Sequence, residues 1–137
     1  MAKNNGKPSE REFLSIWASL PFTYAHRVTD AADLHGINGR PVGDFPKPSD
    51  FIILEPDGIH FAEVKSTVSQ TSFSYDQLER GQKSTAAQCA RCKTPLSYRI
   101  YVHAIALGKW FIITADEFVS DTKSGIKSRK WESLTPW

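Results

Sequence analysis

Long hydrophobic runs are absent from this sequence. No stretch approaches the roughly 20 consecutive apolar residues that a membrane-spanning helix needs. The N-terminus also lacks the basic segment followed by an apolar block that marks a secretory signal. We therefore expect no membrane partner, and a protein that stays in the cytoplasm, the compartment in which it is made.

Cysteine is equally scarce, since the chain has only Cys89 and Cys92, in a single C-x-x-C. A structural zinc site usually needs four ligands, and neither a second C-x-x-C nor an H-x-x-x-H accompanies this one. The four histidines show no metal-ligand spacing either. We favour two reduced cysteines on or near a helix over a metal or redox role.

A large excess of one charge is also lacking, because 17 Lys and Arg against 15 Asp and Glu give a formal net charge of +2. Such mild basicity is compatible with nucleic-acid binding but is not evidence for it. What the chain does have is 137 residues with 40% hydrophobic content, which suits one globular domain. Residues 1–8 and roughly 121–137 are candidates for flexible tails.

The first regular pattern along the chain is helical. Apolar residues recur at the helical period from Phe13 to Leu20, and Pro21 ends the pattern. Ser9 is followed three residues later by Glu12, the spacing of a capping box in which each side chain satisfies a backbone N–H of the other. We therefore predict a helix that begins at Ser9.

Five strands and two further helices are predicted beyond this point. Strands are expected at 22–28, 51–54, 59–65, 98–106 and 109–114, helices at 75–92 and 116–119, long loops at 29–48 and 66–74, and a hairpin turn at 55–58. The major elements follow the order α-β-β-β-α-β-β. One mixed sheet flanked by two helices would bury them, so the fold class is α/β.

The pattern that points to chemistry is Asp50 followed by Glu63, Val64 and Lys65. Glu63 and Lys65 share one face of the second hairpin strand, while Val64 faces the core. The hairpin brings Asp50 beside Glu63. Mg²⁺ favours such carboxylates, and the carbonyl of Val64 adds another oxygen ligand. Lys65 would orient water or stabilise developing charge during phosphodiester hydrolysis. The alternative is an ordinary cross-strand salt bridge.

Two flanking helices offer further polar residues. Glu10 borders the apolar stripe of the first helix and would reach the metal if that helix packs on the sheet; otherwise it merely favours the helix dipole. Gln82 and Lys83 belong to a polar, basic face of the helix at 75–92, where they would contact substrate or remain solvated.

The sequence also resembles a known family. Residues 6–13, Gly-Lys-Pro-Ser-Glu-Arg-Glu-Phe, look like the opening G-x-x-x-E-R-E of archaeal-type Holliday-junction resolvases. Asp50 and the Glu63-Val64-Lys65-Ser66 string match the later D…E-V-K motif of that family. These enzymes belong to the PD-(D/E)XK nuclease superfamily, whose Pro-Asp pair is present here as Pro48-Ser49-Asp50 with one residue inserted. The resemblance covers about residues 6–85.

The resemblance implies a restriction-endonuclease-like sheet and a homodimer that cuts branched double-stranded DNA at two symmetry-related strands. It assigns catalysis to Glu10, Asp50, Glu63 and Lys65, and metal binding to the three acids, with Mg²⁺ as cofactor and Mn²⁺ as a substitute. It also makes Arg11 a DNA contact.

The chain departs from the family in one place. Residues 29–47 form a much longer segment than the short Ser/Gly stretch typical of archaeal-type enzymes. It would place Arg27 and Arg40 on DNA phosphates or change the substrate. Two alternatives to junction resolution therefore stay open, a nuclease of the same superfamily acting in restriction or repair, and a non-catalytic DNA-binding module. The intact set of acids and lysine speaks against the second.

Overall fold

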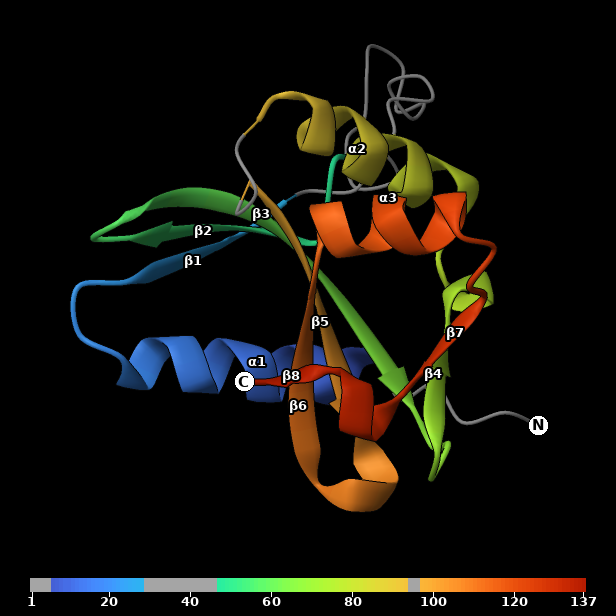
Figure 1. The fold of residues 1–137 in the computed structure, drawn as a ribbon. Coiled ribbons are helices and arrows are strands. Elements are labelled where there is room, and N and C mark those ends of the chain that lie inside the picture. Colours follow the sequence, from blue (N-terminus) through green and yellow to red (C-terminus); the bar gives the residue numbers. More distant parts are fainter. Residues whose placement is uncertain (1–5, 29–46, 94–96) are drawn as a thin grey trace, which may run out of the picture.

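A computed structural model describes residues 6–28, 47–93 and 97–137. Within these ranges a six-stranded sheet has the order β1-β2-β3-β5-β6-β8, and β4 and β7 form a separate two-stranded sheet. Helix α1 covers one face of the large sheet, while α2 and α3 cover the other (Figure 1). Because β3 and β5 pair in parallel and the other pairs are antiparallel, the predicted α/β class with a mixed sheet is confirmed.

The described helices are α1 (Gly6–Ser19), α2 (Arg80–Arg91) and α3 (Ala115–Lys123). The strands are β1 (Tyr24–Arg27), β2 (Phe51–Glu55), β3 (Gly58–Thr67), β4 (Ser72–Ser74), β5 (Tyr98–Ala104), β6 (Lys109–Thr114), β7 (Ser128–Lys130) and β8 (Thr135–Pro136). None of the helices in the described part of the chain is long and apolar enough to cross a membrane.

Helix α1 begins earlier than predicted, and the expected capping box is wrong. The helix is already formed at Gly6, so Ser9 lies inside its first turns. The Ser9 hydroxyl is instead 2.8 Å from Nδ1 of His103, and the Glu12 carboxylate is 3.3 Å from Nε2 of the same ring. A partner 94 residues away in sequence therefore replaces the local hydrogen bonds that the spacing indicated.

The predicted hairpin of β2 and β3 is confirmed. Its register pairs Phe51 with Ala62 and Glu55 with Gly58, and Gly58 has a positive φ of 146° that favours glycine. Strand β3 runs further than expected, through Thr67, because its second half pairs with β5. The segment 66–74, predicted as loop, thus contains the end of β3 and all of β4.

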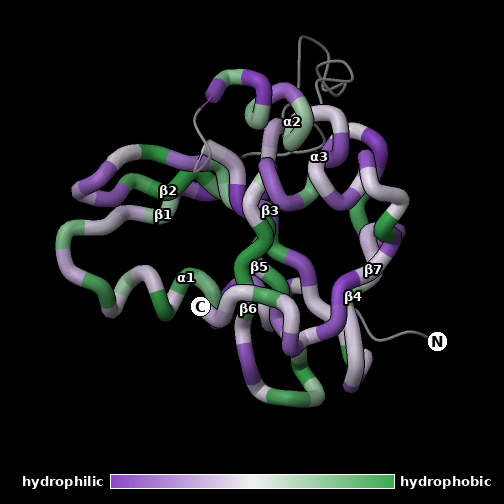
Figure 2. Tube along the Cα trace, viewed as in Figure 1, coloured by the Kyte–Doolittle hydropathy of each residue, from purple (hydrophilic) through white to green (hydrophobic). Residues whose placement is uncertain are grey.

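Side chains alternate between two hydrophobic clusters on opposite faces of the sheet. Ala62 and Val64 of β3 pack towards α1 with Phe13 and Trp17, as predicted for Val64. Phe61, which precedes Ala62, packs towards α2 and α3. Figure 2 shows hydrophobic residues concentrated in β2, β3 and β5, between the helical layers. Glu63 lies on the α2 face of this apolar layer, where Gln82 contacts it.

The C-terminal segment is structured, contrary to the expectation of a flexible tail. Helix α3 extends well beyond the predicted residues 116–119, β7 pairs with β4, and β8 pairs with β6. Trp131 stacks on Phe111 with ring centroids 5.1 Å apart, and the ring centroids of Trp137 and Tyr101 are 4.8 Å apart. Both tryptophans pack into the hydrophobic clusters of this chain.

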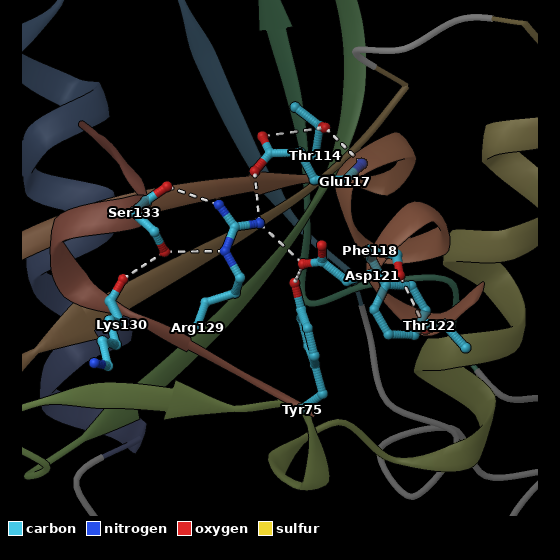
Figure 3. Close-up of polar contacts among 9 residues, drawn as sticks. All are labelled: Tyr75, Thr114, Glu117, Phe118, Asp121, Thr122, Arg129, Lys130 and Ser133. Atoms are coloured by element: carbon cyan, nitrogen blue, oxygen red, sulfur yellow. Dashed lines mark hydrogen bonds and ion pairs between the residues drawn. The ribbon is translucent and has the colours of Figure 1, made fainter. Parts of the chain in front are cut away.

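A buried polar network fixes this segment to the rest of the fold (Figure 3). The Tyr75 hydroxyl donates to Oδ2 of Asp121 at 2.5 Å, and Nη1 of Arg129 donates to the same oxygen at 2.9 Å. Arg129 also donates to the carbonyl of Ser133 at 2.7 Å. The network joins three parts of the molecule, since Tyr75 follows β4, Asp121 belongs to α3 and Arg129 to β7.

Candidate active site

The hairpin register places Asp50 beside the middle of β3. Phe51 is the first residue of β2 and pairs with Ala62, so β2 ends before it reaches Val64. The Val64 N–H donates instead to Oδ2 of Asp50 at 2.9 Å. Because the N–H and C=O of one strand residue face the same neighbouring strand, the Val64 carbonyl also faces the side on which Asp50 lies.

Glu63 is a buried carboxyl beside this aspartate, with only 2% of its surface exposed. Its Oε1 accepts a hydrogen bond from Nε2 of Gln82 at 2.6 Å and lies 3.8 Å from Nζ of Lys65. Burial, and then the negative charge of Asp50, raise the pKa of Glu63 to about 8, although Lys65 opposes the shift. Glu63 therefore tends to keep its proton at neutral pH.

Two lysines face this acidic pair. Lys65 was predicted, and its position near Glu63 agrees with the shared strand face. Lys47 was not predicted, yet its Nζ lies 3.2 Å from Oδ1 of Asp50. The three-residue spacing between Lys47 and Asp50 was the available signal.

The donor set fits a hard divalent cation. Mg²⁺ is commonly held by one or two carboxylates, with water and substrate oxygens completing its coordination. Asp50, Glu63 and the Val64 carbonyl supply such oxygens at one end of the β2–β3 hairpin. Within the described ranges, no three or more His, Cys, Asp or Glu side chains gather into a metal-binding group.

Glu10 lies near the same end of the sheet but is paired with Arg27. Its Oε2 is 3.0 Å from Nη1 of Arg27, and both residues line a cavity of about 160 Å³ together with Arg11. The neighbouring Val28 N–H donates to the Asp50 carbonyl at 2.9 Å, which links this strand end to the acidic pair. A metal-binding role for Glu10 stays a prediction.

The described residues among those predicted to contact DNA lie at separate places in the fold, apart from Arg11 and Arg27, which line the same cavity. Arg11 and Arg27 are exposed, whereas Arg40 lies outside the described residues, as does most of the segment at 29–47. Lys83 lines a separate cavity between α2 and α3. Gln82 points inward: its amide donates to Glu63, and its Oε1 accepts the Glu79 N–H at 2.8 Å, which completes the capping box of α2.

The cysteine pair lies apart from the acidic residues, at the end of α2. Cys89 is part-buried and Cys92 is exposed, and they form no disulfide. Burial raises the pKa of the Cys89 thiol. Cys89 lies on α2 and Cys92 directly follows it, so the expected position on or near a helix is confirmed.

No protein-family model and no curated protein matches this chain. The case for a function therefore depends on the geometry of Asp50, Glu63 and Lys65 and on the motif that contains them.

Proposed function

We propose that this protein is a Mg²⁺-dependent endodeoxyribonuclease of the PD-(D/E)XK type, with a restriction-endonuclease-like sheet, that resolves four-way DNA junctions as a homodimer. One observation supports the proposal above all others. The buried carboxyl of Glu63 meets the half-buried carboxyl of Asp50 at the end of the hairpin, with the Lys65 ammonium 3.8 Å from Glu63. The spacing of these residues in sequence is that of the nuclease motif.

Each residue has a role in this proposal. Asp50, Glu63 and the Val64 carbonyl would hold Mg²⁺. When bound, the metal polarises a phosphoryl oxygen and makes water a better nucleophile. The Lys65 ammonium orients that water or stabilises negative charge that develops on the phosphate. The Gln82 amide holds Glu63 in place through a hydrogen bond of 2.6 Å. Because burial and the charge of Asp50 raise the pKa of Glu63 to about 8, Glu63 would have to give up its proton to hold Mg²⁺.

An ordinary salt bridge between Lys65 and Glu63 is the simplest competing explanation. Exposed ion pairs of that kind stabilise proteins only slightly and need no second acid. Here Glu63 is buried, and Asp50 beside it raises the pKa of Glu63 further. Such an arrangement disfavours folding unless a cation or a proton balances it. A cation-binding site accounts for both carboxyls, whereas a salt bridge accounts for one.

The test compares a labelled immobile four-way junction with a linear duplex of the same sequence, in Mg²⁺ and in EDTA. We expect paired, symmetric, Mg²⁺-dependent cuts confined to the junction. Asp50→Asn and Glu63→Gln should abolish cutting, because each removes a metal-binding charge with little change of shape. Asp57→Asn, an exposed acid in the turn of the same hairpin, is the matched control and should cut normally.

Substituting Ca²⁺ for Mg²⁺ separates binding from chemistry. Ca²⁺ accepts looser coordination, so it should permit junction binding without cutting. Equal cutting of junction and duplex would retain the active site but favour a restriction or repair substrate. Tight junction binding with no cutting in any metal would favour the non-catalytic module.

A further inference from the structure

Tyr98 carries a buried hydroxyl that has no hydrogen-bond partner in the described part of the chain. The side chain is 0% exposed. Buried polar groups are nearly always hydrogen-bonded, and an unsatisfied one lowers stability. Two indole N–H groups, of Trp17 and Trp110, share this condition, but both belong to the cluster on the α1 side. Tyr98 belongs to the cluster on the α2 side, the side that Glu63 faces.

The strand register places Tyr98 near Glu63. In the parallel pairing of β3 with β5, Phe61 faces Tyr98 and Glu63 faces Ile100. Tyr98 is therefore a diagonal neighbour of Glu63 on one sheet face, a separation that an aromatic side chain spans. After burial, the charges of Glu63 and Asp50 are the largest influences that raise the pKa of the Tyr98 hydroxyl.

A buried carboxylate that binds a metal also needs hydrogen-bond donors for those of its lone pairs that do not contact the metal. Such hydrogen bonds orient the carboxylate as a ligand. Gln82 and Lys65 both approach Oε1 of Glu63. We propose that Tyr98 is a positioning residue of this site, and that its hydroxyl donates a hydrogen bond to the Glu63 carboxylate when the carboxylate binds a divalent cation. This inference rests on the proposed function, because it assumes that Glu63 binds a metal.

The test uses Tyr98→Phe in the full chain, with Tyr101→Phe as the matched control. Tyr101 is on the same strand and equally buried, but its hydroxyl already has partners on the other face, Nε2 of His60 at 2.9 Å and Nη1 of Arg99 at 3.2 Å. Calorimetric titration with Mn²⁺ measures metal affinity, and thermal unfolding without metal measures stability.

We expect Tyr98→Phe to bind Mn²⁺ at least about tenfold more weakly, the effect typical of losing a partner of a metal ligand. Its melting temperature should be equal to or above that of the unsubstituted protein, since an unpartnered hydroxyl has been removed. Tyr101→Phe should show the reverse, a lower melting temperature with unchanged Mn²⁺ affinity.

Labelling tyrosine at ¹³Cζ gives a readout that does not depend on activity, and the four tyrosines keep the spectrum simple. The signal that Tyr98→Phe removes should shift when Mg²⁺ is added to the unsubstituted protein, whereas the Tyr101 signal should not. Unchanged Mn²⁺ affinity in Tyr98→Phe, with a stationary Tyr98 signal, would overturn the role of Tyr98 alone. Failure of the unsubstituted protein to bind Mn²⁺ would overturn both proposals, and Mn²⁺ binding without DNA cleavage would remove the nuclease but not Tyr98.

Discussion

Glu63 occupies a place in the sheet whose neighbour on β5 is the fully buried Ile100. An ionised carboxylate at such a position loses its hydration, and Asp50 adds the repulsion of a like charge. The pKa of Glu63 is accordingly raised to about 8. Glu63 is therefore a residue at which the proposed chemistry opposes the stability of the metal-free fold.

This conflict predicts how stability depends on pH in the absence of metal. An ordinary glutamate has a pKa of 4.5, whereas the pKa of Glu63 in the folded protein is about 8. Between these two pH values the folded state therefore binds more protons than the unfolded state. The stability that the folded state gains from the proton on Glu63 is fully present below pH 4.5 and is lost as the pH rises through 8. We expect the free energy of unfolding to fall by a few kcal/mol between pH 5 and pH 9.

Urea denaturation in EDTA at several pH values measures this loss. Glu63→Gln should be the matched comparison, because it keeps an uncharged side chain of the same shape and removes the titrating group. We expect a flatter pH dependence in the variant and greater stability than the unsubstituted protein at pH 9. Parallel pH curves for the two proteins would show that Glu63 does not titrate as the geometry indicates.

At the scale of elements, the three-membered network at the C-terminus connects parts of the chain that sequence separates widely. Asp121 accepts from both Tyr75 and Arg129 while only 7% exposed (Figure 3). Asp121→Ala leaves both donors without that acceptor, so we expect a loss of about 2 kcal/mol in the free energy of unfolding. Urea denaturation at pH 7 measures it.

An exposed acid in the same helix gives the control for this prediction. Asp116→Ala removes a charge from the first turn of α3 without touching the network, so its effect should stay within a few tenths of a kcal/mol. Equal losses in the two variants would show that Asp121 acts only as a helix charge. A loss of stability confined to Asp121→Ala would show that the network holds the C-terminal segment in place.

The sequence pattern predicted those elements that depend on residues close together in the chain. The β2–β3 hairpin has a turn sequence and apolar strands, and it alone sets Asp50 beside Glu63. Strands β4 and β7 have three residues each and pair Ser72 with Lys130, so neither contains enough alternation to be recognised. The burial of Glu63 could not be predicted from the sequence either, because it depends on how α2 packs Gln82 against the sheet.

At the scale of the whole molecule, the described chain provides one pair of carboxyls at the end of one hairpin, and therefore one proposed cutting site. Resolution of a four-way junction requires two cuts in symmetry-related strands, so the proposal needs a two-fold dimer with a site in each subunit. Paired cutting and subunit number are thus linked.

Mixed dimers test that link. Glu63→Gln subunits, exchanged with unsubstituted ones at increasing ratios, should yield dimers with one active site. On a supercoiled plasmid that extrudes a cruciform, two cuts in one binding event give linear product, whereas one cut gives a nicked circle. We therefore expect the ratio of nicked to linear product to rise with the fraction of variant. If the protein instead cuts as an independent monomer, total activity should fall in proportion to the fraction of variant, and the product ratio should depend only on the concentration of active enzyme. The control is unsubstituted protein diluted to that same active concentration. A mixture that gives more nicked product than this control indicates a dimer, and an equal ratio indicates a monomer.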